Sequence, residues 1–178
     1  MAARLSARLT ARLLFALCAL LPLTLGAAPA GTLPLSAFPR ERIAVETRAS
    51  IRRHLFEAWR ADSPRTREQG FMFVEDREVR PDQAMIFVYE TPQYVAMWMK
   101  NTLLPLDMLF VDEHGCVVTI RQSAKPGSLA QIESRVPVAL VVELKAGTVA
   151  AQGMAVGDRV VRLDAGWPAD DVACTAPR

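Results

Sequence analysis

The feature that most constrains the fold is a succession of short apolar segments, each five to nine residues long, separated by turn-forming residues. Segments of this length are typical of β-strands and are too short for most helices. We expect eight strands, at 43–47, 55–61, 84–89, 94–99, 106–112, 116–123, 136–144 and 159–163. The clearest hairpin joins 106–112 to 116–123, because Glu113-His114-Gly115 supplies a turn between two apolar segments.

Two short helices are expected between these strands. Ser63-Pro64 is typical of a helix start, because serine can cap the free N–H groups and proline lacks an N–H that the first turn would leave unpaired. Gly70 is expected to end this helix. The second helix covers 148–152 and stops at Gly153.

Together these elements predict a mainly β fold: a single compact antiparallel barrel or jelly-roll-like sandwich with one or two short helices. Apolar residues on both faces of several strands favour a closed or covered sheet. The sequence has no regular alternation of strands and helices, which argues against a doubly wound parallel sheet. The 178 residues suffice for one domain and are too few for two ordinary ones.

The first 30 residues predict a secretory signal peptide. Arg4, Arg8 and Arg12 precede an apolar run at 13–25, and small residues at 28–30 predict cleavage after Ala30. The alternative is an uncleaved membrane anchor. Thirteen helical residues would span only about 20 Å of a hydrocarbon core that is roughly 30 Å thick, so the length favours the signal peptide. We therefore expect a periplasmic or secreted protein without stable membrane insertion after cleavage.

Four segments follow from this division: the signal peptide at 1–30, a linker and first strand at 31–53, the main domain at 54–163, and a flexible tail at 164–178. Cleavage would leave 18 basic and 19 acidic side chains, a net charge of −1. That balance gives no electrostatic reason to expect binding to nucleic acid or to anionic lipid. No protein partner is indicated by the sequence.

Two cysteines remain in the mature chain, Cys116 and Cys174. An oxidising compartment makes a disulfide between them possible, and two free thiols are the alternative, because sequence alone does not fix their geometry.

The stretch from 98 to 110 carries the candidate site. Asp107 falls within a strand that is apolar on both faces, so its carboxylate needs a partner; Lys100, Asn101, Thr102 and main-chain N–H groups are the near candidates. In a functional interpretation Trp98, Lys100, Asn101 and Asp107 line a ligand-binding pocket. In a structural interpretation the polar residues only shape the bend, and Trp98 and Met99 belong to the core.

Several motifs give the chain a resemblance to a known family. They are Gly70-Phe71-Met72-Phe73, Met85-Ile86-Phe87, Trp98-Met99-Lys100-Asn101-Thr102 with Pro105-Leu106-Asp107, Glu143-Leu144 and Val156-Gly157-Asp158. Together they closely resemble the domain of unknown function 192 family over roughly 54–163. The resemblance implies a compact, mainly β, exported or membrane-associated bacterial domain with a jelly-roll-like core, and it implies no activity. Ala84 and Phe71 depart from the family pattern in positions that affect packing.

Other chemistries find little support. His54 and His114 are the only histidines and lie far apart, so we expect no metal site, and no cofactor motif is present. Our first functional hypothesis is a small-ligand or glycan-binding module of the cell envelope. The alternative is an envelope accessory protein whose polar residues are structural. A hydrolase or lyase that uses Lys100 as a base is the least favoured, so enzymatic activity stays open.

Overall fold

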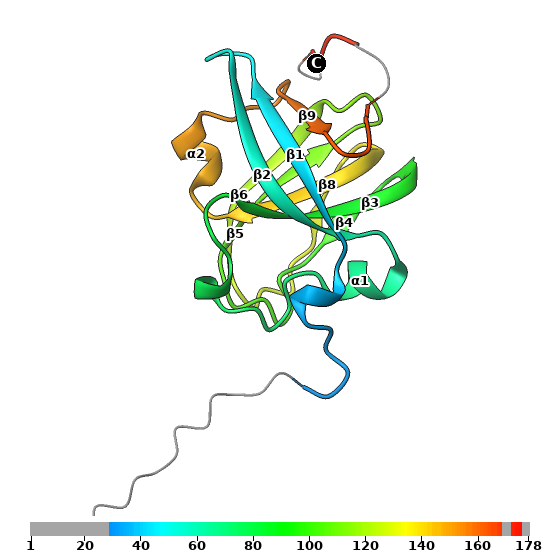
Figure 1. Cartoon of the computed structure of the whole chain (residues 1–178), viewed down its shortest axis with the longest axis vertical. Helices are drawn as coiled ribbons and strands as arrows, with labels where there is room; N and C mark the ends of the chain where they lie inside the picture. Colours follow the sequence, from blue (N-terminus) through cyan, green and yellow to red (C-terminus); the bar gives the residue numbers. More distant parts are fainter. Residues whose placement is uncertain (1–28, 169–171, 176–178) are drawn as a thin grey trace, which may run out of the picture.

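The computed structural model describes residues 29–168 and 172–175, and within these ranges the chain forms a seven-stranded sheet and a two-stranded sheet (Figure 1). The strands are β1 (Arg40–Thr47), β2 (Arg52–Ala61), β3 (Gln83–Gln93), β4 (Ala96–Met97), β5 (Leu106–Val111), β6 (Val117–Ala124), β7 (Ile132–Glu133), β8 (Val138–Lys145) and β9 (Arg159–Arg162). The helices are α1 (Pro64–Gln69) and α2 (Thr148–Gln152), with 3₁₀ turns at Leu35–Ala37 and Asp76–Glu78. The prediction of a mainly β fold with two short helices is confirmed.

The large sheet has the strand order β6-β5-β8-β3-β2-β1-β9 and curls into a half-barrel (Figure 1). Its two end strands approach each other at one point, where Cys116 and Arg159 form an isolated antiparallel β-bridge. There the N–H of Val117 donates to the carbonyl of Asp158 at 2.9 Å, and the N–H of Val160 donates to the carbonyl of Gly115 at 2.8 Å. These bonds form a short seam between β6 and β9.

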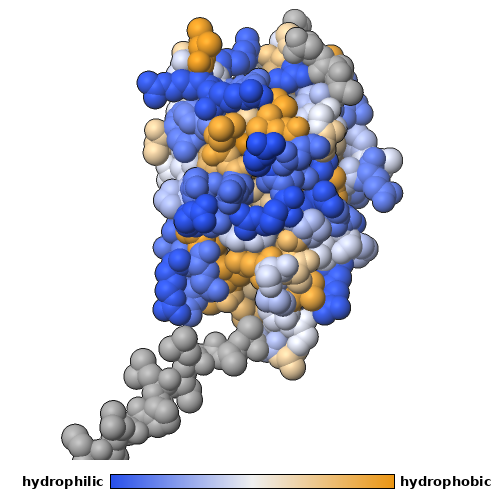
Figure 2. All heavy atoms as spheres, viewed as in Figure 1, coloured by the Kyte–Doolittle hydropathy of each residue, from blue (hydrophilic) through white to orange (hydrophobic). Residues whose placement is uncertain are grey.

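Both faces of the large sheet are covered by apolar packing, as the sequence predicted. Side chains alternate between the faces along each strand, so Met85 and Phe87 of β3 belong to one core cluster and Ile86 to the other. The second cluster also contains Val149 of α2. Charged residues on the outside separate small apolar areas on the face shown in Figure 2.

Helix α1 begins and ends where the sequence predicted. The hydroxyl of Ser63 accepts from the N–H of Thr66 at 3.2 Å, and the hydroxyl of Thr66 accepts from the N–H of Ser63 at 3.0 Å. This reciprocal cap pairs two N–H groups that the first turn of a helix leaves free. Gly70 and Gly153 lie directly after the last residues of α1 and α2.

Two details of the predicted strand pattern were wrong. Residues 90–93, which lie between the strands expected at 84–89 and 94–99, continue β3, and Gln93 still pairs with Val138 of β8 after a register shift. Of the strand expected at 94–99, only Ala96–Met97 forms a strand, and it pairs with β7.

The direction of one strand pair also differs from the antiparallel expectation. Strands β2 and β3 run parallel, with α1 in the connection between them, so the sheet is mixed.

The described part of the C-terminal segment contacts the end of the sheet that carries β9 (Figure 1). Cys174 forms a disulfide with Cys116, with the two sulfur atoms 2.06 Å apart. Asp164 accepts hydrogen bonds from the main chain and the guanidinium of Arg42. The predicted signal peptide at 1–30 lies, except for its last two residues, outside the described residues. No helix within the described ranges has the length and apolar character needed to cross a membrane.

Candidate functional site

The run from Trp98 to Thr102 forms a tight bend that two other segments hold in place. Asn101 occupies the left-handed region at φ 56°, and the N–H of Thr102 donates to the carbonyl of Met99 at 3.0 Å. The N–H of Met99 donates to the carbonyl of Ser128 at 3.0 Å, and the N–H of Gly127 donates to the carbonyl of Thr102 at 3.2 Å. The bend is therefore fixed against the loop that follows β6.

Trp98 and Lys100 lie together on the surface of this bend. The Nζ of Lys100 is 5.0 Å from the centre of the Trp98 ring, and Trp98 is 42% exposed. An ammonium at this distance from an indole is a cation–π contact. Asn101 is exposed, and its side-chain amide lies 4.0 Å from the sulfur of Met72. A core position for Trp98, which the structural interpretation assumed, is not found.

Asp107 has a different environment from the other three predicted site residues. It is fully buried; Oδ1 accepts from the N–H of Ser123 at 2.9 Å, and Oδ2 accepts from the N–H of Val149 at 2.9 Å. Main-chain N–H groups were among the partners considered, but Lys100 and Asn101 are not bonded to this carboxylate among the described residues. Asp107 therefore positions β6 and α2 and does not reach the surface beside Trp98.

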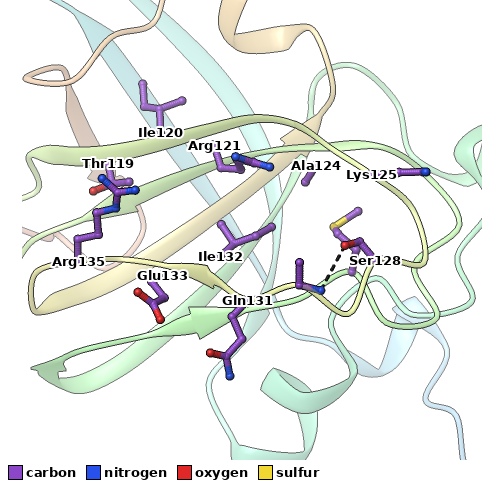
Figure 3. Close-up of a pocket in the computed structure, with 12 residues that line it drawn as sticks. Thr119, Ile120, Arg121, Ala124, Lys125, Ser128, Gln131, Ile132, Glu133 and Arg135 are labelled. Atoms are coloured by element: carbon purple, nitrogen blue, oxygen red, sulfur yellow. Dashed lines mark hydrogen bonds between the residues drawn. The ribbon is translucent and has the colours of Figure 1, made fainter.

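A groove of about 370 Å³ opens next to this bend, between β6 on one side and the segment 128–135 on the other (Figure 3). Met99, which lies between Trp98 and Lys100 in the sequence, forms part of its wall. Apolar side chains of Ile120, Ala124 and Ile132 line it together with Met99. The polar side chains at the groove are Thr119, Arg121, Lys125, Ser128, Gln131, Glu133 and Arg135.

Three cationic side chains at this groove are available to a ligand. The side chains of Arg121, Lys125 and Arg135 form no hydrogen bond or ion pair within the described ranges, whereas the Lys145 ammonium lies 3.0 Å from a carboxylate oxygen of Asp76. Arg135 also holds a left-handed backbone conformation at φ 65°. Residues 117–132 contain Arg121 and Lys125 and no acidic residue. The sequence reasoning did not identify this groove; the acid-free run was the signal that could have indicated it.

The comparisons with known proteins agree with the architecture. The model of the DUF192 family, described as "Uncharacterized ACR, COG1430", matches residues 45–162. The chain belongs to the DUF192 family. This confirms the resemblance that the sequence motifs indicated, and the family description states no activity.

Two solved structures are similar to this DUF192 chain. One is a "putative transcription regulator" from Sinorhizobium meliloti 1021, with 46% identity, a TM-score of 0.67, and coverage of 70% of this chain and 95% of that one. The other is a protein of unknown function from Novosphingobium aromaticivorans DSM 12444, with 31% identity, a TM-score of 0.67, and coverage of 75% and 92%. No functionally curated protein matches the sequence.

The DUF192 core also contains a buried carboxyl group that sequence reasoning did not single out. Glu143 of β8 is 3% exposed and lies in register between Met85 of β3 and Met108 of β5. Its Oε2 has no hydrogen-bond partner among the described residues, and burial raises the pKa of Glu143 to about 8. The group is therefore neutral at pH 7 and acts as part of the core, because no groove described above reaches it.

The described residues contain no group of three or more His, Cys, Asp or Glu side chains arranged to hold a metal ion. The groove beside Met99 brings together three cationic side chains that have no partner within the described ranges. It presents their positive charge, the Glu133 carboxylate, hydroxyls and an amide around an apolar floor, and the excess of cations suits recognition of an anion attached to a small organic group.

Proposed function

We propose that this protein is an exported binding domain for a small anionic ligand, such as a sugar derivative that carries a carboxylate or a phosphate. One observation carries the proposal: Arg121, Lys125 and Arg135 line one groove without internal partners. Charge-assisted hydrogen bonds from guanidinium and ammonium groups to carboxylate or phosphate are among the stronger polar contacts in proteins. Two arginines also allow planar, two-point contacts with an oxyanion.

The size and lining of the groove support a small ligand. A volume of about 370 Å³ lies within the range of ordinary small-molecule sites. The apolar wall formed by the partly exposed Ile120 and Ile132 can pack against the uncharged part of the ligand, while Gln131 and Ser128 can bond to hydroxyl groups. Trp98 and Lys100 lie at the neighbouring bend, so they extend the same recognition surface, and Asp107 contributes only by positioning β6.

Export is part of the proposal. The layout of residues 1–30 supports a signal peptide, and the disulfide between Cys116 and Cys174 is compatible with an oxidising compartment. A ligand met in the periplasm or outside the cell would be a metabolite or an envelope fragment. The alternative, an envelope accessory protein that works through a surface contact, gains support from the exposed Trp98.

Native mass spectrometry of the protein purified from the periplasm tests the proposal. We expect a bound anionic species in the wild type and its loss in Arg121→Ala/Arg135→Ala. Titration with N-acetylmuramic acid and with N-acetylglucosamine then compares two similar sugars of which only the first carries a carboxylate. A bare wild-type mass, together with equal responses to both sugars, would reject an anion site. The control is Arg52→Ala, which changes an exposed arginine of the β1–β2 hairpin.

A further inference from the structure

Two loops lie side by side at the bend formed by residues 98–102. We call this surface, residues 98–104 and 125–130, the two-loop tip. The hydrogen bonds from Met99 to Ser128 and from Gly127 to Thr102 hold the loops side by side. A third bond, from the N–H of Phe73 to the carbonyl of Asn101 at 2.8 Å, ties the tip to the chain after α1. The tip is therefore a pre-formed surface.

The two-loop tip exposes three large apolar side chains. Trp98 is 42% exposed, Leu103 is 54% exposed, and Leu129 is 69% exposed. The backbone bonds place Trp98 near Leu129, because their neighbours Met99 and Ser128 are bonded to each other. Single exposed leucines are common on protein surfaces, but here an indole and two leucines are exposed on two adjacent loops that main-chain bonds hold together.

The two loops of the tip carry charges of one sign, and the exposed Glu133 of β7, which pairs with Ala96 of β4, is an acid that the fold brings nearby. The segments 94–106 and 117–132 contain no aspartate or glutamate, and they carry Lys100, Arg121 and Lys125. The predicted mature chain has only three lysines, and two of them, Lys100 and Lys125, lie on the two-loop tip. Lysine side chains can extend their ammonium groups to a polar boundary while their stems remain against apolar surface.

We propose that the two-loop tip docks on the surface of a membrane that contains anionic lipids. Tryptophan is favoured at the boundary between lipid headgroups and acyl chains, where its ring is apolar and its N–H can still bond. Leu103 and Leu129 enter the same boundary region, and Lys100 and Lys125 face the lipid phosphates. The contact is shallow and reversible, so it differs from membrane insertion. It adjoins the proposed ligand groove and shares Lys125 with it.

Charge complementarity favours a lipid surface over a protein partner. The tip, residues 98–104 and 125–130, combines a few apolar side chains with two lysines and no acid, which matches an amphipathic anionic surface. Anionic lipids attract lysines near the membrane surface, so removing the charge of Lys100 and Lys125 is expected to weaken binding by about tenfold or more. The net charge of −1 expected for the mature chain hides this local asymmetry.

Vesicle co-sedimentation tests the proposal with the full chain. The vesicles are phosphatidylcholine alone and phosphatidylcholine mixed with phosphatidylglycerol. Wild-type protein is expected to bind the anionic vesicles more tightly, with an affinity that falls as salt rises. Leu103→Ser/Leu129→Ser and Lys100→Gln/Lys125→Gln are each expected to lose about tenfold in partitioning to anionic vesicles. Trp98→Ala extends the series.

The matched control is Ile51→Ser/Leu55→Ser, which removes two exposed apolar side chains from the β1–β2 hairpin, 93% and 63% exposed. All variants carry the same N-terminal segment, so differences between them report the tip. Equal partitioning of the wild type and the two-leucine variant, or equal loss in the hairpin control, overturns the proposal. Binding to neither vesicle by the wild type also overturns it. Because the sugar titration uses no lipid, failure here leaves the groove proposal intact.

Discussion

The carboxylate of Asp107 in β5 accepts a hydrogen bond at 2.9 Å from the main-chain N–H of Val149, 42 residues further along the chain. Its second oxygen accepts from Ser123 of β6, where the backbone takes a left-handed conformation at φ 51°. One buried side chain thus joins the first turn of α2 to an irregular point of an adjacent strand. That arrangement explains why an aspartate is present in a strand whose other residues are all apolar.

We expect Asp107→Ala to lower stability strongly. The substitution would remove the acceptor of the buried Val149 N–H, at about 1–3 kcal/mol, and the acceptor of the N–H of Ser123, an exposed residue where the loss costs less. Urea denaturation should therefore show a loss of roughly 2–4 kcal/mol. Lys100→Ala, two residues beyond the exposed Trp98, is the control and should change stability by less than about 0.5 kcal/mol. Similar losses in both variants would contradict the assigned structural role of Asp107.

Glu143 makes stability depend on pH in a defined direction. Its pKa in the folded protein is raised to about 8 from an ordinary value of 4.5, so the unfolded state loses its proton first. This group therefore lowers the free energy of unfolding as pH rises from 4.5 towards 8, on the order of 3 kcal/mol by pH 7. Glu143→Gln stays neutral and should lack this decline.

The measurement is a series of urea denaturations at pH 5, 6, 7 and 8 for the wild type and Glu143→Gln. As pH rises, the free energy of unfolding of the wild type should fall relative to that of the variant. Glu133→Gln, at an exposed position beside the groove, serves as the control. A constant difference between wild type and Glu143→Gln across this range would show that the buried carboxyl is not held neutral.

Reduction of the disulfide should be visible both by mass and by stability. Alkylation of the denatured mature protein should add two more groups when a reductant is present than when it is absent. Because the bridge closes a separation of 58 residues, Cys116→Ser/Cys174→Ser should cost about 2–4 kcal/mol. Equal masses with and without reductant would exclude the bridge.

Gly115 should tolerate no side chain. A Cβ there would lie 2.7 Å from the carbonyl oxygen of Val160, the residue whose N–H donates to the carbonyl of Gly115 in the seam between β6 and β9. Gly115→Ala should therefore lower the melting temperature more than Gly127→Ala. Gly127 also has a positive φ, of 70°, but has open space around its Cβ position, so it isolates backbone strain from the steric clash. Thermal unfolding followed by circular dichroism compares the two.

Local sequence signals predicted those parts of the fold that depend on neighbouring residues. The hairpin of β5 and β6 and the cap of α1 at Ser63 were found because alternation, turn residues and capping residues lie within a few positions of one another. Residues 90–93 were misread because Pro92 is typical of turns and because glutamate, present at Glu90, is depleted in strands. Their extended conformation depends on pairing with β8, which the sequence does not display.

The candidate site was less predictable for the same reason. Asp107 was recognised as a residue that needs a partner, but Val149 is brought to it only by the complete fold. The groove combines residues from 99 to 135, and its cations at 121, 125 and 135 have no regular spacing. Trp98 and Lys100 were identified because they share one short motif, and the structure places them in contact.

The contact between β6 and β9 bears on how copies of this chain meet one another. An open strand edge offers unpaired N–H and C=O groups to any other extended chain, and such edges favour aggregation. Here the main-chain groups of Gly115, Val117 and Val160 are paired within the molecule. That stretch of the sheet margin cannot template cross-strand pairing between molecules, which favours a monodisperse protein at high concentration.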